Sequence, residues 1–416
     1  MPMPPTAPAP EGRAGSPAAN RTVITYAFWI TMAGTTVPTP LYPLYQQAFG
    51  FSSLMVTVVF AVYAIGVVAG LLAFGRLSDQ IGRRPVIALA LLLAAVAAGM
   101  FLAADGLAWM LPARVLTGFS AALVTGSATA ALLDLAAPGG RARAQSLAIG
   151  ANMGGLACGT LLSGLLAQWA PSPLRLPWLV TLALTAVAAA GVAALPRGAH
   201  RTAALNLRPQ ALRVPAGIRP AFLRAALAAG SGFAVLGVLT SVTGLFLAQL
   251  LHLEDPALTG LVVFLAFACT ALGQFAARAL RPGPALATAC GGLVLASALI
   301  AVALLDRSLA PLLAGACFNG LATGAAVGNG LAVINAGTPP ERRGEVVSTF
   351  FAILYAMLSV PVIGVGLLIR ASGLRTAGVT FSALVAALAL IVAVSLLRGA
   401  RGGGEPDGDP DGGRVR

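Results

Sequence analysis

A short charged stretch holds residue types that could join two parts of a protein through ion pairs. It runs from Gly75 to Arg84 between two long apolar runs and includes Asp79 and Arg83. These charges are costly next to hydrocarbon, so the stretch belongs where a membrane ends. Gly75 and Gly82 permit a tight turn and close helix packing, because glycine has no side chain to clash. Asp79 lies at or just before the start of the next helix, where a negative charge suits the helix dipole.

Two further charged residues lie in the apolar run over residues 107–135. Asp134 lies near the inner end of this run, and Arg114 lies within it. At 1.5 Å per residue, Arg114 is about 10 Å from the outer end. A charge at that depth normally faces a cavity or a partner. The alternative is that its long side chain extends to the outer headgroups, and we favour the cavity.

Neutral polar side chains mark the other candidate functional positions in the apolar runs. The first apolar run is rich in hydroxyl groups and is interrupted by Pro38 and Pro40. Broken helices often line transport sites, although a kinked packing helix would have the same pattern. An isolated polar residue in another run can equally form a hydrogen bond between helices. Besides Arg114, the candidates are Thr35, Thr36, Tyr63, Asn152, Asn319 and Asn329.

The sequence does not contain the residue groups that metal sites and enzyme active sites require. Its 4 cysteines lie in apolar runs without metal-like spacing, and its 2 histidines lie in predicted loops. The apolar runs hold no histidine and no carboxylate pair, and no Walker-type phosphate loop is present. We therefore predict no metal, no cofactor and no direct use of ATP. An intramembrane enzyme is a remote alternative.

The composition indicates a membrane protein with many spans. Of the 416 residues, 58% are hydrophobic and 9% are charged, whereas soluble proteins carry about 25% charged residues. The net charge of +13 does not indicate nucleic-acid binding, because the basic residues punctuate apolar runs instead of clustering on one face. All 26 of these residues are arginine, as expected of a GC-rich genome.

Twelve apolar runs are long enough to cross a bilayer, which takes about 20 residues each. They predict an all-α membrane protein with 12 transmembrane helices. The predicted spans are residues 22–45, 54–75, 85–103, 107–135, 142–168, 176–196, 221–248, 257–279, 284–305, 309–336, 343–369 and 375–398.

The distribution of arginine predicts the orientation of the chain. With the N-terminus inside, the loops assigned to the outside contain four arginines, Arg175, Arg307, Arg370 and Arg375. Nearly all others fall at inner loops, tails and helix ends, as the positive-inside rule requires. We therefore expect a multi-pass protein of the cell inner (plasma) membrane with both termini in the cytoplasm.

A long polar connection divides the chain into two six-helix, pseudo-symmetric bundles. The bundles cover residues 21–196 and 221–398, joined by a cytoplasmic loop over 197–220, with disordered cytoplasmic tails over 1–20 and 399–416. Such parallel repeats are typical of secondary transporters. Matching motifs lead into the fifth and eleventh spans: Pro138, Arg141, Arg143 and Ser146 in the first half, and Pro340, Arg342, Arg343 and Ser348 in the second.

The charged stretch resembles the signature loop of the major facilitator superfamily. In that family the loop acts as a latch, whose charges contact neighbouring helices and the opposite bundle and hold the outward-open state. The resemblance implies that Asp134 pairs with Arg83. The alternative is that these charges are ordinary anchors in the headgroup region. The matching residues are Gly75, Asp79, Gly82, Arg83 and Arg84, after the second of twelve predicted spans.

The fifth predicted span resembles the helix-five motif of antiporters in this superfamily. Gly155, Gly159 and Gly164 match the motif and are candidate hinge positions. Thr160 replaces the expected proline, and Ser163 replaces an expected glycine. Small residues at this spacing also serve simple helix packing, so the match to antiporters is partial.

The resemblances imply a secondary transporter that works by alternating access, and not an enzyme. Arg114 and Gly118 resemble a fourth-helix motif associated with proton-coupled members. Our leading hypothesis is efflux of a small, fairly lipophilic compound coupled to protons, by a monomer in the lipid bilayer. One arginine and no mid-membrane carboxylate suit a neutral or anionic cargo better than a cation. The alternative is an importer or facilitator of a small metabolite with the same fold.

Overall fold

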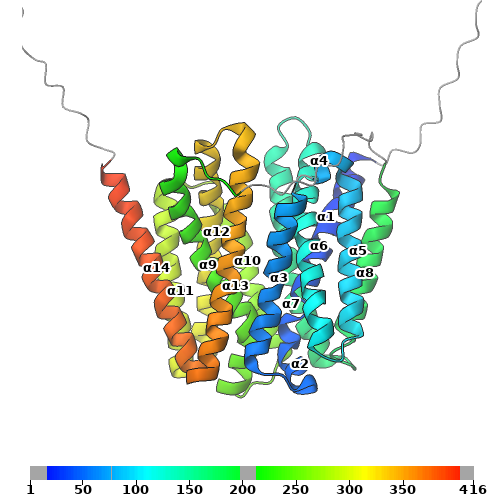
Figure 1. The fold of residues 1–416 in the computed structure, drawn as a ribbon, viewed down its shortest axis with the longest axis vertical. Coiled ribbons are helices and arrows are strands. Elements are labelled where there is room, and N and C mark those ends of the chain that lie inside the picture. Colours follow the sequence, from blue (N-terminus) through cyan, green and yellow to red (C-terminus); the bar gives the residue numbers. More distant parts are fainter. Residues whose placement is uncertain (1–15, 76, 197–211, 403–416) are drawn as a thin grey trace, which may run out of the picture.

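The computed structural model describes residues 16–75, 77–196 and 212–402, and their regular structure is helical. The helices of the first half stand side by side as one bundle, on the right of Figure 1. This bundle consists of α1 (Pro17–Thr36), η1 (Thr39–Leu41), α2 (Tyr42–Phe49), α3 (Ser53–Phe74), α4 (Leu77–Ile81), α5 (Arg83–Leu102), α6 (Leu107–Asp134), α7 (Arg141–Trp169) and α8 (Leu176–Ala194).

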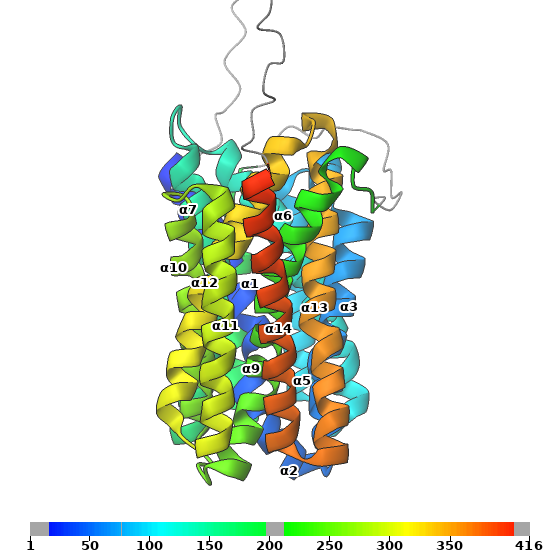
Figure 2. The ribbon, with the colours of Figure 1, turned by 90° about the vertical axis from the view of Figure 1, so that its left-hand side faces the viewer.

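The second half of the chain forms a matching bundle, on the left of Figure 1. Figure 2 shows the same helices from the side of this bundle, with α7 and α10 at one edge and α3 and α13 at the other. The elements are η2 (Ala216–Ile218), α9 (Arg219–Leu250), α10 (Pro256–Ala277), α11 (Pro282–Asp306), α12 (Leu309–Gly337), η3 (Pro340–Arg342), α13 (Arg343–Ser372) and α14 (Leu374–Gly402).

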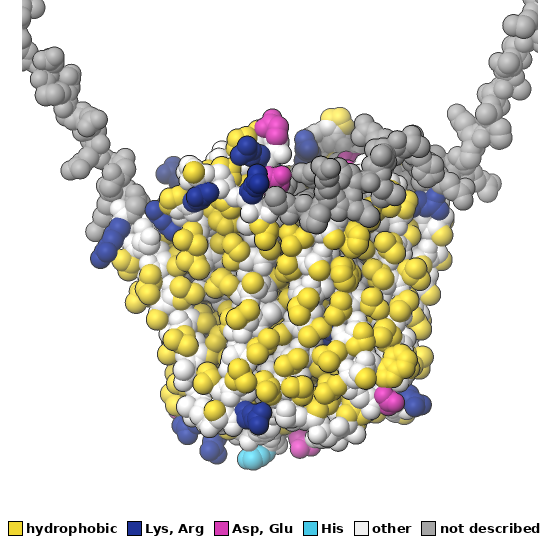
Figure 3. Space-filling view, in the orientation of Figure 1, with side chains coloured by type: hydrophobic (Ala, Val, Ile, Leu, Met, Phe, Trp, Pro, Cys, Tyr) yellow, Lys and Arg dark blue, Asp and Glu magenta, His cyan; other side chains and the backbone are white. Residues whose placement is uncertain are grey.

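This arrangement confirms the prediction of an all-α membrane protein built from two six-helix bundles. Eleven helices among the described residues are long and apolar enough to cross a membrane, and α1 runs alongside them (Figure 1). On the face shown in Figure 3, a broad hydrophobic band covers the middle of the molecule, and charged residues gather at its two ends. We call the end that carries α4 the latch end and the end that carries α2 the opposite end.

The proline-interrupted first span predicted over residues 22–45 consists of three successive elements in the structure. The helix α1 ends at Thr36, and the chain continues through η1 into α2. Proline has no amide hydrogen and clashes with the preceding turn. Pro38 and Pro40 therefore stop the α1 ladder within the bundle, and Pro43 lies in the first turn of α2.

The predicted boundaries of the tails and of the central loop also need correction. The helix α1 begins at Pro17, inside the predicted tail, because the Ser16 side chain accepts a hydrogen bond from the amide of Ala19 and caps the first turn. The helix α14 continues past residue 398 to Gly402, and α9 begins at Arg219, just inside the predicted loop. The rest of these three segments, residues 1–15, 197–211 and 403–416, lies outside the described residues.

Paired glycines bring α3 and α6 into backbone contact. A methyl group added at Gly118 would clash with the backbone of Tyr63, and one added at Gly66 would clash with the backbone of Val115. Small residues allow membrane helices to approach this closely. The contact fixes α6 against α3 beside Arg114, so it sets the position of that side chain.

The two bundles meet at the opposite end through a set of close, uncharged contacts that we call the seam. In each contact a glycine of one bundle packs on a residue of the other, leaving no room for a side chain. The Thr160 hydroxyl also donates a hydrogen bond of 3.2 Å to the Gly260 carbonyl. The glycine contacts are Gly164 on Pro256, Gly260 on Thr160, Gly366 on Thr57 and Gly244 on Pro43.

Replacing Gly118 by alanine should destabilise the first bundle. The added methyl group would push α6 away from α3, and overpacking of this kind lowers the free energy of unfolding by about 1–3 kcal/mol. We expect a lower apparent melting temperature for Gly118→Ala in detergent. Gly126→Ala is the matched control, because Gly126 lies in the same helix with open space around it. Equal melting temperatures for the two variants would contradict this account.

Candidate functional site

The charged turn at the latch end consists of the short helix α4 and the start of α5. The helix α3 ends before Gly75, whose backbone keeps a helical φ of −58°. Gly82 has a φ of +97° and precedes Arg83, the first residue of α5. A residue with a side chain would be strained at this left-handed φ, so the turn requires glycine at position 82. Asp79 lies in α4, before the start of α5.

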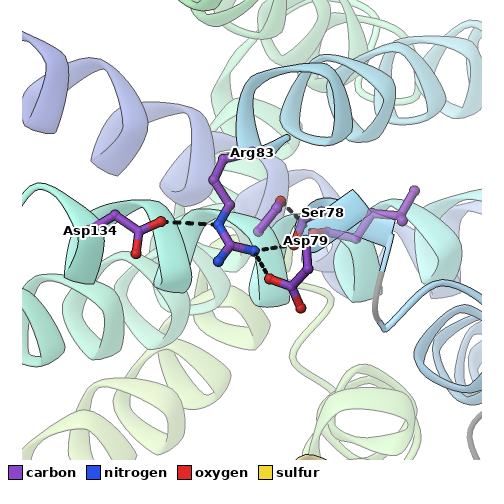
Figure 4. A network of polar contacts seen from close by, with 6 residues as sticks. Ser78, Asp79, Arg83 and Asp134 are labelled. Atoms are coloured by element: carbon purple, nitrogen blue, oxygen red, sulfur yellow. Dashed lines mark hydrogen bonds and ion pairs between the residues drawn. The ribbon is translucent and has the colours of Figure 1, made fainter. Parts of the chain in front are cut away.

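The Arg83 side chain joins α4, α5 and α6. Its Nε atom donates a hydrogen bond of 3.1 Å to Asp134, and its Nη1 atom contacts both Asp79 and the Ser78 hydroxyl (Figure 4). The structure thus brings Arg83 together with both aspartates, and these contacts lie within the first bundle. Asp79 and Asp134 are more than 60% exposed, and ion pairs in water stabilise a fold little. The network therefore fixes geometry more than it stabilises the fold.

The neighbouring Arg84 points to a different helix. It donates hydrogen bonds to the carbonyl oxygens of Val192 and Ala193, at the end of α8. The last carbonyls of a helix lack partners within the helix and carry partial negative charge. Arg84 thus caps α8, and the two consecutive arginines attach the start of α5 to α6 and α8.

A pocket of about 610 Å³ opens beside these residues at the latch end. Arg83, Arg84 and Asp134 form part of its wall, together with Asn20 and Ile24 of α1. Most of the remaining lining is aliphatic. The network thus borders an open space, and its charges can change partners without first being exposed by unfolding.

Arg114 is buried, with 2% of its surface exposed. Its Nη1 atom donates a hydrogen bond of 2.7 Å to the Thr35 carbonyl, and its Nε atom donates one of 3.3 Å to the Val59 carbonyl. The guanidinium carbon lies 4.7 Å from the centre of the Tyr63 ring, within the range of a cation–π interaction. The interpretation of Arg114 as reaching to the outer headgroups is therefore wrong.

The Thr35 carbonyl belongs to the broken end of α1, where the backbone needs partners from outside the helix. Backbone groups at membrane depth must be satisfied within the protein. Arg114 donates a hydrogen bond to the Thr35 carbonyl, and the Ser163 hydroxyl donates one of 2.7 Å to the Val37 carbonyl. The Thr36 hydroxyl donates one of 2.8 Å to the Leu156 carbonyl. The break is thus held by side chains of α6 and by α7.

An aromatic chain leads from this centre into the second bundle. The rings of Tyr63 and Tyr355 form an edge-to-face contact, with their centroids 6.3 Å apart. Tyr355 contacts Phe233 of α9 in a similar way at 6.2 Å. Sequence reasoning missed Tyr355 and Phe233, because a single aromatic residue in an apolar run gives no signal. Ser163 appeared only as a departure from a motif.

The three candidate asparagines have no described polar contact with this centre. The Asn319 amide donates to the Gly232 carbonyl at 3.5 Å, and the Asn329 amide donates to Ala325 of its own helix at 2.9 Å. The side-chain oxygens of Asn152, Asn319 and Asn329 are buried and accept no hydrogen bond from the described residues. Buried acceptors without donors are costly, so these oxygens stay candidates for contact with water or cargo.

The glycines of the helix-five motif lie at contacts between helices. Methyl groups added at Gly155 and Gly159 would clash with the α1 backbone, and one added at Gly164 would clash with Pro256 of the second bundle. The helix α7 is continuous from Arg141 to Trp169. These positions therefore let α1 and α10 approach closely, and their role as hinges stays a prediction.

The described residues contain no group of three or more histidine, cysteine, aspartate or glutamate side chains that could hold a metal ion. The four cysteines are free thiols, one each on α7, α10, α11 and α12, and Cys269 contacts Cys317. The chemistry available at the centre is therefore that of a buried guanidinium group, hydroxyl groups and aromatic faces.

Comparisons with known proteins agree with this architecture. The family model of the Major Facilitator Superfamily matches residues 24–313. No curated protein matches the chain. Three solved structures illustrate the similarity, and because each is under 25% identical, they show the fold alone.

The first is an inward-facing, occupied bacterial homologue of the human lysosomal transporter Spinster, with 17% identity, a TM-score of 0.68, and coverage of 92% of this chain and 96% of that chain. The human organic anion transporter TETRAN has 19% identity and a TM-score of 0.64, over 92% of this chain and 100% of that chain. A D-xylose-proton symporter has 13% identity and a TM-score of 0.73, over 91% of this chain and 97% of that chain.

Replacing Arg114 by methionine should destabilise the protein, because the Thr35 carbonyl would lose its donor. A buried group left without its partner costs about 1–3 kcal/mol. We expect a lower apparent melting temperature in detergent for Arg114→Met, with Arg114→Lys in between. Arg370→Met, at an exposed arginine of α13, is the control. If Arg114→Met and the wild type have the same apparent melting temperature, the guanidinium group does not stabilise the break in α1.

Proposed function

Because this chain belongs to the major facilitator superfamily, we propose that it is a secondary transporter that exports a small, fairly lipophilic compound in exchange for protons. It acts as a monomer in the cell inner membrane, with the latch end and both termini in the cytoplasm. The family match and the two-bundle fold support alternating access. The residues around Arg114 support the choice of cargo.

The observation that carries the cargo class is the buried charge of Arg114 next to the aromatic chain between the bundles. Its described polar contacts are carbonyl oxygens, not carboxylates. A buried positive charge without a negative partner repels a cation. The aromatic faces of Tyr63, Tyr355 and Phe233 offer apolar contact area. A neutral or anionic lipophilic compound fits both features.

The proposed mechanism assigns different tasks to the two ends of the molecule. The seam closes the opposite end through uncharged contacts. At the latch end, Arg83 holds Asp79 and Asp134 within one bundle. We assign these three residues, with Gly75, Gly82 and Arg84, to a latch that biases the equilibrium between inward-open and outward-open states. Thr35, Thr36 and the three asparagines are assigned to the pathway.

One observation favours a second candidate, a facilitator or importer of a small metabolite. The Thr160 hydroxyl, where antiporters carry proline, forms a hydrogen bond across the seam. Together with the absence of a mid-membrane carboxylate in the sequence, this supports transport without proton exchange.

Transport by purified protein in liposomes should depend on an imposed pH gradient. The cargo is first identified by comparing the drug and metabolite susceptibility of cells with and without the gene. Flux of that compound is then measured with the gradient present and with the gradient collapsed by an ionophore. The proposal expects faster flux when protons can move against the cargo.

The outcomes of these experiments separate the two candidates. Sensitivity to toxic compounds after deletion supports export, whereas loss of growth on a nutrient supports import. Flux that is indifferent to the pH gradient would remove proton exchange and leave a facilitator.

Asp79→Asn should reduce transport several-fold while expression and membrane insertion stay near normal. The substitution removes one negative partner of Arg83, and such an exposed pair contributes only about 0–1 kcal/mol to stability. Flux and melting temperature are measured on the same preparation. Asp105→Asn serves as the control, since Asp105 is an exposed aspartate between α5 and α6. Unchanged flux in Asp79→Asn would mean that the charged turn is only an anchor.

A further inference from the structure

A furrow between α1 and α7 at the latch end has no role in the proposed transport cycle. It has a volume of about 580 Å³. One face of each helix lines it, with residues spaced three or four apart, such as Arg21 and Thr25 on α1 and Arg143 and Leu147 on α7. The furrow is therefore a surface groove that follows two helices, and both helices start at the same end of the molecule.

Positive charge gathers at the mouth of this furrow. Arg21 and Arg143 line it. Arg278, from the end of α10, approaches its wall and donates a hydrogen bond of 2.6 Å to the Ser146 hydroxyl. None of the described residues in the lining is acidic, and neither α1 nor α7 has an acidic residue in its first turn. Three arginines without a described counter-ion in the lining favour an anion.

The backbone adds to this preference. Both α1 and α7 begin at this end, at Pro17 and Arg141. The first turn of a helix carries partial positive charge and attracts anions. Two helix starts therefore lie at the same end of the furrow as Arg21 and Arg143, and Arg278 binds Ser146 of its wall.

Farther from the mouth, the lining changes from charged to aromatic and apolar. Tyr26 and Trp29 stack with their ring centroids 6.2 Å apart, and the Tyr26 hydroxyl donates to the Leu184 carbonyl of α8. Aromatic residues of this kind concentrate at the membrane–water interface. From Arg21 to Trp29 the helix rises about 12 Å at 1.5 Å per residue. Gly150 leaves open space above the apolar part of the wall.

We propose that this furrow binds an anionic phospholipid. Its phosphate lies between Arg21 and Arg143, and the part of an acyl chain nearest the headgroup lies along Trp29 and Leu147. A free anion would contact only the arginines at the mouth. Along the furrow, arginines are followed by aromatic rings and then by apolar side chains, and this order matches the headgroup, the interfacial region and the acyl chains of a lipid. Basic pockets between membrane helices bind lipid headgroups in this way. Because Ser146 also holds Arg278, the lipid lies at a contact between the two bundles.

The test measures binding of phosphatidylglycerol to the delipidated full-length protein by native mass spectrometry and by thermal shift in detergent. Phosphatidylcholine and inorganic phosphate are the comparison ligands. For the wild type we expect a higher melting temperature with phosphatidylglycerol than with phosphatidylcholine. The double variant Arg21→Gln, Arg143→Gln should bind phosphatidylglycerol about tenfold more weakly or worse.

Arg342→Gln is the matched control, because it removes an exposed arginine from the second half of the chain, outside the furrow. It should bind phosphatidylglycerol as the wild type does. Equal binding by the double variant would overturn the proposal. Equal stabilisation of the wild type by inorganic phosphate would also overturn it, because the site would then serve a free anion. Transport need not be measured, so failure here leaves the proposed function standing.

Discussion

The hydrogen bond from the Arg114 guanidinium group to the Thr35 carbonyl is the interaction on which the rest of the first bundle depends. A helix that stops within a membrane leaves carbonyl groups that lipid cannot satisfy. The prolines after Thr36 stop α1, and Arg114 and Ser163 supply donors from two other helices. Loss of those donors would destabilise the turn from α1 into η1 and α2, which brings α2 against α9 of the second bundle.

Close packing by glycine makes this interaction geometrically possible. Gly118 lets α6 approach α3, and Gly155 and Gly159 let α7 approach α1. The donors on α6 and α7 therefore come within reach of the broken end of α1. Larger residues at these positions would separate the helices and leave the carbonyls without partners. The glycine pattern and the buried arginine are thus two parts of one arrangement.

The sequence predicts the fold well, because hydrophobic length alone locates most spans. The boundaries of α3, α5 and α12 differ from the predicted spans by at most two residues. The pair Arg83 and Asp134 follows from a known family motif and lies within 3.1 Å. Tyr355 and Arg278 could not be predicted as site residues, because their contacts depend on how the two bundles face each other. The break in α1 was visible as prolines, but its extent depends on distant donors.

The uncharged seam at the opposite end has a consequence for how ions in solution act on the molecule. Its glycine contacts and the Thr160 hydrogen bond involve no net charge, so dissolved salt does not weaken them. The exposed network around Arg83 is charged, and at physiological ionic strength the Debye length is about 8 Å. Salt therefore weakens the network around Arg83 and leaves the contacts of the seam unchanged. A change in ionic strength therefore changes the stability of the charged contacts at the latch end relative to the seam, without any change in cargo.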